Sequence, residues 1–160
     1  MPNLSFRPID EADRDFLSAV YASTRTEELA QVDWDEQQKA AFLEMQFSAQ
    51  HQYYQEHYKG TDFLIILLDN QPIGRFYISR WSSEFRIVDL ALLPEFRDTG
   101  IGTQILRNVL SEATTLGKPV RIHVERFNPA QNLYRRLGFA KTGEYGVYDL
   151  MEWSDKKQAC

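Results

Sequence analysis

Apolar residues recur at helical spacing in the first third of the chain. After a strand predicted over residues 4–9, the acidic segment 10–13 has the composition of a helix start with a capping aspartate. The apolar stripe of this first helix consists of Phe16, Leu17, Val20 and Tyr21. A second helix is predicted from about residue 35 to residue 58, followed by Gly60. Its expected apolar face consists of Ala41, Met45, Ala49 and Tyr53.

The pattern changes after residue 60, where short apolar runs separated by turn residues predict strands. Three consecutive runs, at 63–68, 73–79 and 86–92, indicate an antiparallel meander. A helix over about 103–116, which Gly117 ends, then leads to a strand at 120–124. A short helix over 129–137 and strands at 139–144 and 147–153 complete the series. The order β-α-α-β-β-β-α-β-α-β-β predicts an α/β protein.

Length and composition fit one globular domain. The chain has 160 residues, 43% hydrophobic and 26% charged, which excludes a disordered, collagen-like or disulfide-rich protein. The single cysteine, Cys160, permits no intrachain disulfide, and the scattered histidines His51, His57 and His123 form no metal-binding pattern. The longest apolar run, 63–68, is too short to span a membrane, and the N-terminus lacks signal-peptide features. We therefore expect a cytoplasmic protein with no metal and no membrane partner.

Charge is unevenly distributed along a chain whose net charge is −5. Residues 1–80 carry 7 basic and 13 acidic side chains, a net charge of −6, whereas residues 97–141 carry 8 basic and 3 acidic ones, a net charge of +5. The overall acidity argues against nucleic acid as a partner, since phosphate backbones bind basic surfaces. The locally basic segment suits an anionic small ligand.

Two glycines stand at the junction between strand 86–92 and the following helix. The segment reads Arg97-Asp98-Thr99-Gly100-Ile101-Gly102-Thr103. Glycines let the backbone turn sharply, and the free N–H groups of a first helical turn bind phosphate or pyrophosphate. The segment lacks the lysine of a P-loop, and Ile105 stands where a Rossmann fingerprint has its third glycine. A dinucleotide site, with Glu125 as the ribose-binding acid, is the weaker alternative, and a simple connecting turn is another.

A second segment, residues 128–139, carries the signals of a short helix. Asn128 is a capping residue, Pro129 suits the first helical position and Gly138 ends the helix. The shared apolar face consists of Ala130, Leu133, Tyr134 and Leu137. By itself, this pattern is equally that of an ordinary packed helix with a half-buried tyrosine.

Together the two segments resemble the GNAT superfamily of acyl-CoA-dependent N-acetyltransferases. The acyl-CoA loop of that family, Arg/Gln-x-x-Gly-x-Gly/Ala between a strand and a helix, matches at Arg97, Gly100 and Gly102. The later helix of the family matches at Asn128, Ala130, Leu133, Tyr134, Gly138 and Phe139. The resemblance implies one GNAT domain over residues 1–155 and a polar tail over 156–160. It also implies a mixed central sheet of six to seven strands flanked by about four helices.

The resemblance further implies that acetyl-CoA is the acetyl donor and that a primary amine of a small molecule or peptide attacks it directly in a ternary complex. The pyrophosphate would rest, beside Arg97, on the N–H groups of Asp98, Thr99, Gly100, Ile101, Gly102 and Thr103. Pantetheine would pair with backbone near Leu90 and Leu92 and hydrogen-bond Asn128 and Asn132. The N–H near Leu92 would polarise the thioester carbonyl, and Tyr134 would protonate the departing thiolate.

The general base and the acceptor stay open at this stage. Some family members carry a glutamate early in the strand before the loop, but Arg86 occupies that position here. The alternatives are a chain of water molecules or one of four side chains, Glu84, Asp89, His123 and Glu125. His51 and His57 are expected to be exposed, and the acidic N-terminal half favours a cationic amine. An acyl-CoA-binding module with little turnover is the alternative function, and the strand at 147–153 suggests a homodimer.

Overall fold

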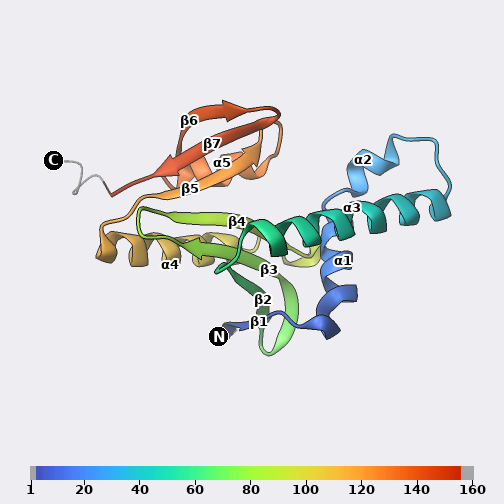
Figure 1. Ribbon diagram of the computed structural model, residues 1–160, viewed down its shortest axis with the longest axis horizontal. Helices are drawn as coiled ribbons and strands as arrows, with labels where there is room; N and C mark the ends of the chain where they lie inside the picture. The colour runs from blue at the N-terminus through green and yellow to red at the C-terminus, as the bar shows by residue number, and fades with distance from the viewer. Residues whose placement is uncertain (1–2, 156–160) are drawn as a thin grey trace. The chain divides into compact units, whose positions relative to one another are not determined.

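Seven strands and five α-helices make up residues 3–155, the part of the chain that the computed structural model describes. In chain order the elements are β1 (Leu4–Pro8), η1 (Glu11–Asp13), α1 (Arg14–Ser23), α2 (Thr26–Ala30), α3 (Glu36–His57), β2 (Asp62–Leu68), β3 (Gln71–Arg80), β4 (Phe85–Leu92), η2 (Pro94–Phe96), α4 (Ile101–Leu116), β5 (Val120–Glu125), α5 (Ala130–Arg136), β6 (Ala140–Tyr145) and β7 (Tyr148–Trp153) (Figure 1). The strands form one sheet in the order β1-β2-β3-β4-β5-β7-β6. The sheet is mixed, because β4 and β5 are parallel whereas β5–β7 and β6–β7 are antiparallel. The predicted α/β class and strand number are confirmed, and the predicted tail at 156–160 lies outside the described residues.

The described chain forms two compact units, and strands β3 and β4 contribute residues to both. Unit 1 consists of residues 3–77 and Asp89–Arg97, and unit 2 consists of Ile78–Val88 and residues 98–155. Unit 1 therefore contains the α-helices α1, α2 and α3 and the end of β4. Unit 2 contains the glycine segment after Arg97, the helices α4 and α5, and the strands β5, β6 and β7.

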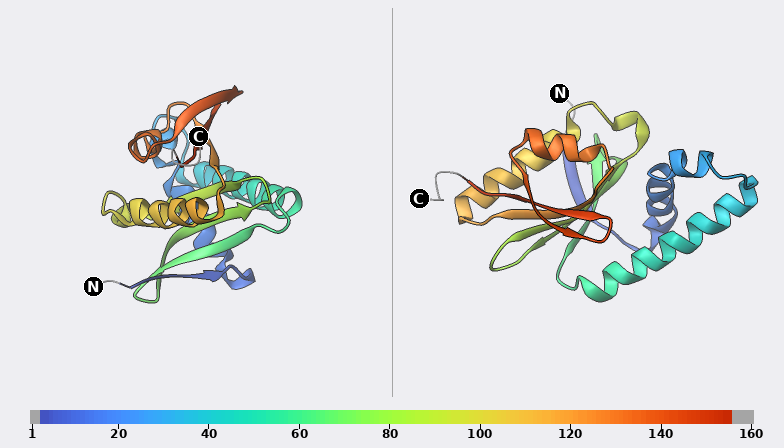
Figure 2. Two further views of the ribbon diagram at one scale, coloured as in Figure 1. Left: turned by 90° about the vertical axis from the view of Figure 1, so that its left-hand side faces the viewer. Right: turned by 90° about the horizontal axis from the view of Figure 1, so that it is seen from above.

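Unit 1 is built around the packing of α1 against α3 (Figure 2). Asp10 begins this region as predicted, since its carboxylate accepts a hydrogen bond from Ala12 N at 2.8 Å and caps η1. The buried cluster between the two helices and β2 consists of Leu17, Tyr21, Phe47 and Ile65. Burial of such side chains contributes about 1.5–3 kcal/mol each, which fixes the helices on this part of the sheet.

The predicted apolar face of α3 is wrong. The residues of that face are exposed, with Met45 at 62% and Tyr53 at 51%. The helix instead buries Phe47, with Leu43 packed against the same cluster. His51, expected to be exposed, is half-buried and stacks on Phe47 at 5.4 Å between ring centroids. The apolar residues of α3 are spread around the helix, so their spacing alone selected the wrong side.

Unit 2 confirms the pattern predicted for α4. The buried residues of this helix are Ile105, Leu106, Val109, Leu110 and Ala113. Gly117 ends the helix with a φ of 68°, a left-handed conformation that favours glycine. Figure 1 shows β5, β7 and β6 side by side in this unit, and the register runs from Val120↔Trp153 to Glu125↔Tyr148 between β5 and β7.

Candidate functional site

The glycine segment forms the N-terminal end of α4. Gly100 is the capping residue with a φ of 88°, and Asp98 also has a positive φ, 57°. The helix starts two residues earlier than predicted, at Ile101, and Gln104 N donates to Gly100 O at 3.0 Å. The N–H groups before Gln104 have no carbonyl partner within the helix, and the helix dipole makes this end positive. The segment from Asp98 to Thr103 thus has the geometry that binds a phosphate group.

Gly102 lies next to α5. A Cβ atom at this glycine would be 3.7 Å from Leu133 Cδ2, an ordinary van der Waals contact. Leu133 belongs to α5, the helix that also carries Tyr134. The first turn of α4 therefore lies beside that helix. The structure therefore brings together two segments that the sequence singled out, namely residues 98–103 and residues 128–139. Both of these ranges lie in unit 2.

Tyr134 is buried on α5 and its ring meets Phe139 edge-on, with the centroids 5.5 Å apart. The helix begins one residue later than predicted, at Ala130, with Pro129 as its capping residue, and Asn128 Oδ1 accepts a hydrogen bond from Ala130 N at 2.9 Å. The amide nitrogen of Asn128 is then the side-chain group that can donate to a ligand. Asn132 is exposed on the same helix.

In unit 1, Arg97 holds the end of β4. Its Nε donates to Leu92 O at 3.0 Å, and its Nη2 donates to Ser23 Oγ at 3.0 Å and to Ser23 O at 3.3 Å. The guanidinium therefore joins the C-terminal end of β4 to the last residue of α1. These hydrogen-bond acceptors are carbonyl and hydroxyl oxygens of unit 1 and not carboxylates. The guanidinium of Arg97 therefore fixes the backbone at Leu92.

The backbone of β4 passes unusually close to β3 between Leu90 and Leu92. A Cβ atom at Gly74 would lie 2.3 Å from Ala91 O and 3.0 Å from Leu92 Cα. Leu93 N also donates to Ile73 O at 2.8 Å. Only a residue without a side chain allows this approach, so Gly74 determines where the end of β4 lies.

Gly74→Ala is accordingly expected to lower the free energy of unfolding by about 3 kcal/mol, the upper part of the range for overpacking, because the obstacle is backbone. Urea unfolding monitored by circular dichroism measures this loss. Gly102→Ala is the matched control, since its Cβ meets only an ordinary contact and it should leave stability within about 0.5 kcal/mol. Equal stabilities of the two variants would contradict the close approach of the strands.

The pairing between β4 and β5 is short. It covers Phe85–Ile87 and Val120–Ile122, after which β4 continues for five residues to Leu92 and β5 continues to Glu125. The backbone of β4 at Leu90 and Leu92, where the family resemblance implies contacts with pantetheine, thus follows the last residue of this parallel register.

A buried ion pair in unit 1 was not predicted from the sequence. Arg75 on β3 is only 3% exposed, and its Nη2 donates to Asp89 Oδ2 at 2.5 Å and to Gln50 Oε1 at 2.9 Å. Burial opposes the charge of Arg75, but the attraction of Asp89 raises the pKa of the guanidinium above its ordinary value. Asp89, one of the candidate bases, is the accessible end of the pair, with 17% of its side chain exposed.

The other candidate bases lie in unit 2. Glu84 is buried, and its two oxygens accept hydrogen bonds from Arg86 Nε at 3.0 Å and Arg121 Nη1 at 2.7 Å, so neither is well placed to take a proton. The Nδ1 of His123 faces Arg86 Nη1 at 3.4 Å. His123 is exposed, but desolvation by the surrounding atoms and then the charge of Arg86 lower the pKa of its imidazole, which is therefore neutral at pH 7. Glu125 is half-buried at the end of β5.

Neither a metal-binding cluster nor a membrane-spanning helix occurs in the described part of the chain. Among residues 3–155, no group of three or more histidine, cysteine, aspartate or glutamate side chains has the arrangement of a metal site. Within the same residues, the helices are too short or too polar to cross a membrane.

Comparison with known proteins gives a family match over most of the chain. Residues 25–139 match the sequence model of the "Acetyltransferase (GNAT) family". The fold is similar to that of the PaiA N-acetyltransferase from Thermoplasma acidophilum in complex with coenzyme A, with a TM-score of 0.70, 19% identity and coverage of 96% of this chain and 99% of that one. An acetyltransferase from Thermus thermophilus is also similar, with a TM-score of 0.67, 15% identity and coverage of 96% and 97%.

Two curated relatives are much longer than this chain. They are the cysteine-rich protein 2-binding proteins of Mus musculus and Homo sapiens, each 41% identical to this chain over 98 residues. The match covers 59% of this chain and 12% of each relative. It therefore concerns one region of those proteins.

Proposed function

Because the chain belongs to the GNAT acetyltransferase family, we propose that it transfers an acetyl group from acetyl-CoA to a primary amine by direct attack in a ternary complex. The observation that carries the proposal is the glycine-capped start of α4 beside the helix that bears Tyr134. The net charge of +5 over residues 97–141 and the coenzyme A complex of a protein with a similar fold support the same donor. The single cysteine and the apolar pattern fit a cytoplasmic setting.

We assign the donor contacts to backbone and amide groups. The N–H groups from Asp98 to Thr103 hold the pyrophosphate, with Arg97 fixing the backbone that leads into them. Backbone groups of Leu90 and Leu92 pair with pantetheine, which the end of the parallel register after Ile87 supports. The amide groups of Asn128 and Asn132 donate to the same arm.

The reaction then proceeds in two bond changes. The amine nitrogen attacks the thioester carbon, and the N–H near Leu92 stabilises the oxyanion that forms, a type of contact that contributes about 3–4 kcal/mol in other enzymes. The carbon–sulfur bond breaks, and Tyr134 gives its proton to the thiolate. The proton of the attacking amine passes to a base or to water. Of the candidate bases, Asp89, His123 and Glu125 keep a partly or fully accessible side chain, whereas both oxygens of Glu84 are engaged.

We propose a cationic amine as the acceptor. The net charge of −6 over residues 1–80 supports this class, because an acidic surface raises the local concentration of a positively charged substrate. The accessible carboxylate of Asp89 adds a negative group one residue before Leu90.

Binding of acetyl-CoA is expected to stabilise the protein against heat. At a concentration one hundred times its Kd, the ligand contributes about 2.7 kcal/mol, which raises the Tm of a chain of this size by about 5–10 °C. Differential scanning fluorimetry measures the shift, with NAD as the control that should leave the Tm unchanged. A shift with NAD and none with acetyl-CoA would favour the dinucleotide alternative.

Release of free coenzyme A thiol with a panel of primary amines tests the transfer itself. We expect polyamines and other cationic amines to support faster thiol release than neutral amines of similar size. Stabilisation by acetyl-CoA without thiol release for any amine would instead indicate an acyl-CoA-binding module.

A further inference from the structure

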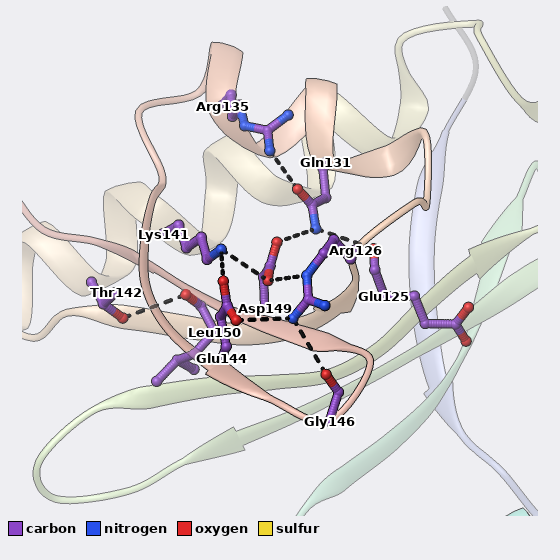
Figure 3. Close-up of polar contacts among 10 residues, drawn as sticks. All are labelled: Glu125, Arg126, Gln131, Arg135, Lys141, Thr142, Glu144, Gly146, Asp149 and Leu150. Carbon is purple, nitrogen blue, oxygen red and sulfur yellow. Dashed lines mark hydrogen bonds and ion pairs between the residues drawn. The ribbon is translucent and has the colours of Figure 1, made fainter.

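A buried carboxylate lies at the centre of a polar cluster in unit 2 (Figure 3). Asp149 on β7 is only 3% exposed. Its Oδ2 accepts a hydrogen bond from Gln131 Nε2 at 3.1 Å, and its Oδ1 accepts one from Arg126 Nε at 3.2 Å and lies 3.5 Å from Lys141 Nζ. Burial of a charge is costly unless partners of this kind surround it. The carboxylate is therefore held by groups from three segments outside its own strand.

Gln131 links this carboxylate to α5. The side chain is 3% exposed, and its Nε2 also donates to Glu125 O, at the end of β5, at 3.1 Å. Its Oε1 accepts a hydrogen bond from Arg135 Nη2 at 2.5 Å. A single amide thus joins β5, β7 and the next turn of α5, as Figure 3 shows. Gln131 precedes Tyr134 by three residues, so both side chains lie on the same buried face of the helix.

Arg126 links the same carboxylate to the segment that leads into α5. Its Nη2 donates to Gly146 O at 3.3 Å, and its backbone N donates to Val147 O at 2.9 Å. Burial raises the pKa of Asp149, but the hydrogen bonds from Gln131 and Arg126 and the charges of Lys141 and Arg126 outweigh it and hold the pKa below its ordinary value. The group therefore stays ionised near neutral pH, and both ends of the segment from Arg126 to Gln131 are attached to it.

We propose that Asp149 is a positioning residue for the transfer reaction, because its carboxylate, through Gln131 and Arg126, fixes the helix that carries Tyr134 and the segment before it that contains Asn128. The inference rests on the proposed function, since it acts through Tyr134. Helix α5 has only seven residues, too few to be stable or fixed in orientation without tertiary contacts. A proton donor must also lie within hydrogen-bond distance of the leaving group, so a small displacement of the helix is costly.

Steady-state kinetics of two variants test the proposal. Asp149→Leu removes the carboxylate, and Gln131→Met removes the amide while it keeps a good helix-forming residue of similar length. Each is expected to lower kcat by about tenfold to a hundredfold, since a displacement of about 1 Å can cost a hundredfold. The KM for the amine should change by less than about twofold. Asp149→Asn keeps an oxygen for Gln131 and should retain an intermediate kcat.

A double-mutant cycle separates this role from general damage to the fold. In the Asp149→Leu background, Gln131→Met should have little further effect on kcat, because the bond that it removes is already lost. Glu144→Gln is the matched control: Glu144 is exposed on β6 and pairs with Lys141 and Arg126 at the outer side of the same cluster, so kcat should be unchanged. Unchanged kcat in Asp149→Leu, or losses that multiply in the double variant, would overturn the proposal.

Hydrogen exchange of the peptide over residues 130–139 distinguishes failure of this inference from failure of the proposed function. Leu137 N donates to Leu133 O at 3.2 Å and Phe139 N to Tyr134 O at 3.0 Å, so these amides report on α5. They are expected to exchange faster in Asp149→Leu than in the wild type or in Glu144→Gln. If the wild type releases no thiol with any amine, the proposed function fails. Faster exchange in Asp149→Leu would still support the inference that Asp149 fixes the position of α5, whereas unchanged exchange would overturn that inference.

Discussion

Tyr134→Phe is expected to lower kcat about a hundredfold and to leave the affinity for acetyl-CoA nearly unchanged. The proposed donor contacts are made by backbone and amide groups, so removal of one hydroxyl takes away the proton donor without the binding groups. A general acid typically contributes about 10²–10⁴-fold. We expect the lower end, because a thiolate with a pKa of about 8.5 is already a fair leaving group.

The variant should fold, because phenylalanine keeps the edge-on packing of the ring at residue 134 against Phe139. Thiol-release kinetics give kcat, and isothermal titration gives the affinity for acetyl-CoA. Tyr145→Phe is the matched control, since Tyr145 is 59% exposed on the β6–β7 hairpin and should lose nothing in turnover. Equal turnover of Tyr134→Phe and the wild type would remove Tyr134 from the mechanism.

Local signals explain why the two motif-bearing segments could be predicted from the sequence. The buried stripe of α4, the left-handed Gly100 and the hydrogen bond from Ala130 N to Asn128 each depend on residues within a few positions of one another. Capping, glycine conformation and helical spacing act over that range, so these features can be predicted from the sequence alone. The roles of Leu90, Leu92 and Asn132 are of another kind: they depend on a bound donor and stay predictions.

Contacts between distant segments explain what the sequence did not reveal. The pair of Arg75 and Asp89 is 14 residues apart, and that of Gln131 and Asp149 is 18 residues apart. Each depends on which residues face each other after the strands and helix have packed, which pattern alone does not specify. One signal was available, since Arg75 interrupts an apolar strand and Asp89 interrupts the next one. Opposite charges within two neighbouring buried strands indicate an ion pair.

Removal of Asp89 is expected to destabilise the protein more than removal of its partner. Asp89→Ala leaves the guanidinium of Arg75, only 3% exposed, without its counter-ion and with Gln50 as its hydrogen-bond acceptor. Loss of one member of a buried pair typically costs about 3–5 kcal/mol. Arg75→Met leaves a carboxylate that is 17% exposed and can be partly hydrated, so its cost should be smaller. Urea unfolding of both variants measures the difference.

The double variant Arg75→Met/Asp89→Leu decides whether the cost arises from the unpaired charge. Apolar residues of similar volume often replace a buried ion pair without loss, so the double variant should be more stable than Asp89→Ala alone. If the double variant is as unstable as Asp89→Ala, the loss comes from packing and not from an orphaned guanidinium. Thiol release by the same double variant tests the role of Asp89 in the reaction. If this variant folds and its kcat and its KM for the amine are unchanged, the carboxylate of Asp89 takes part neither in proton transfer nor in acceptor binding.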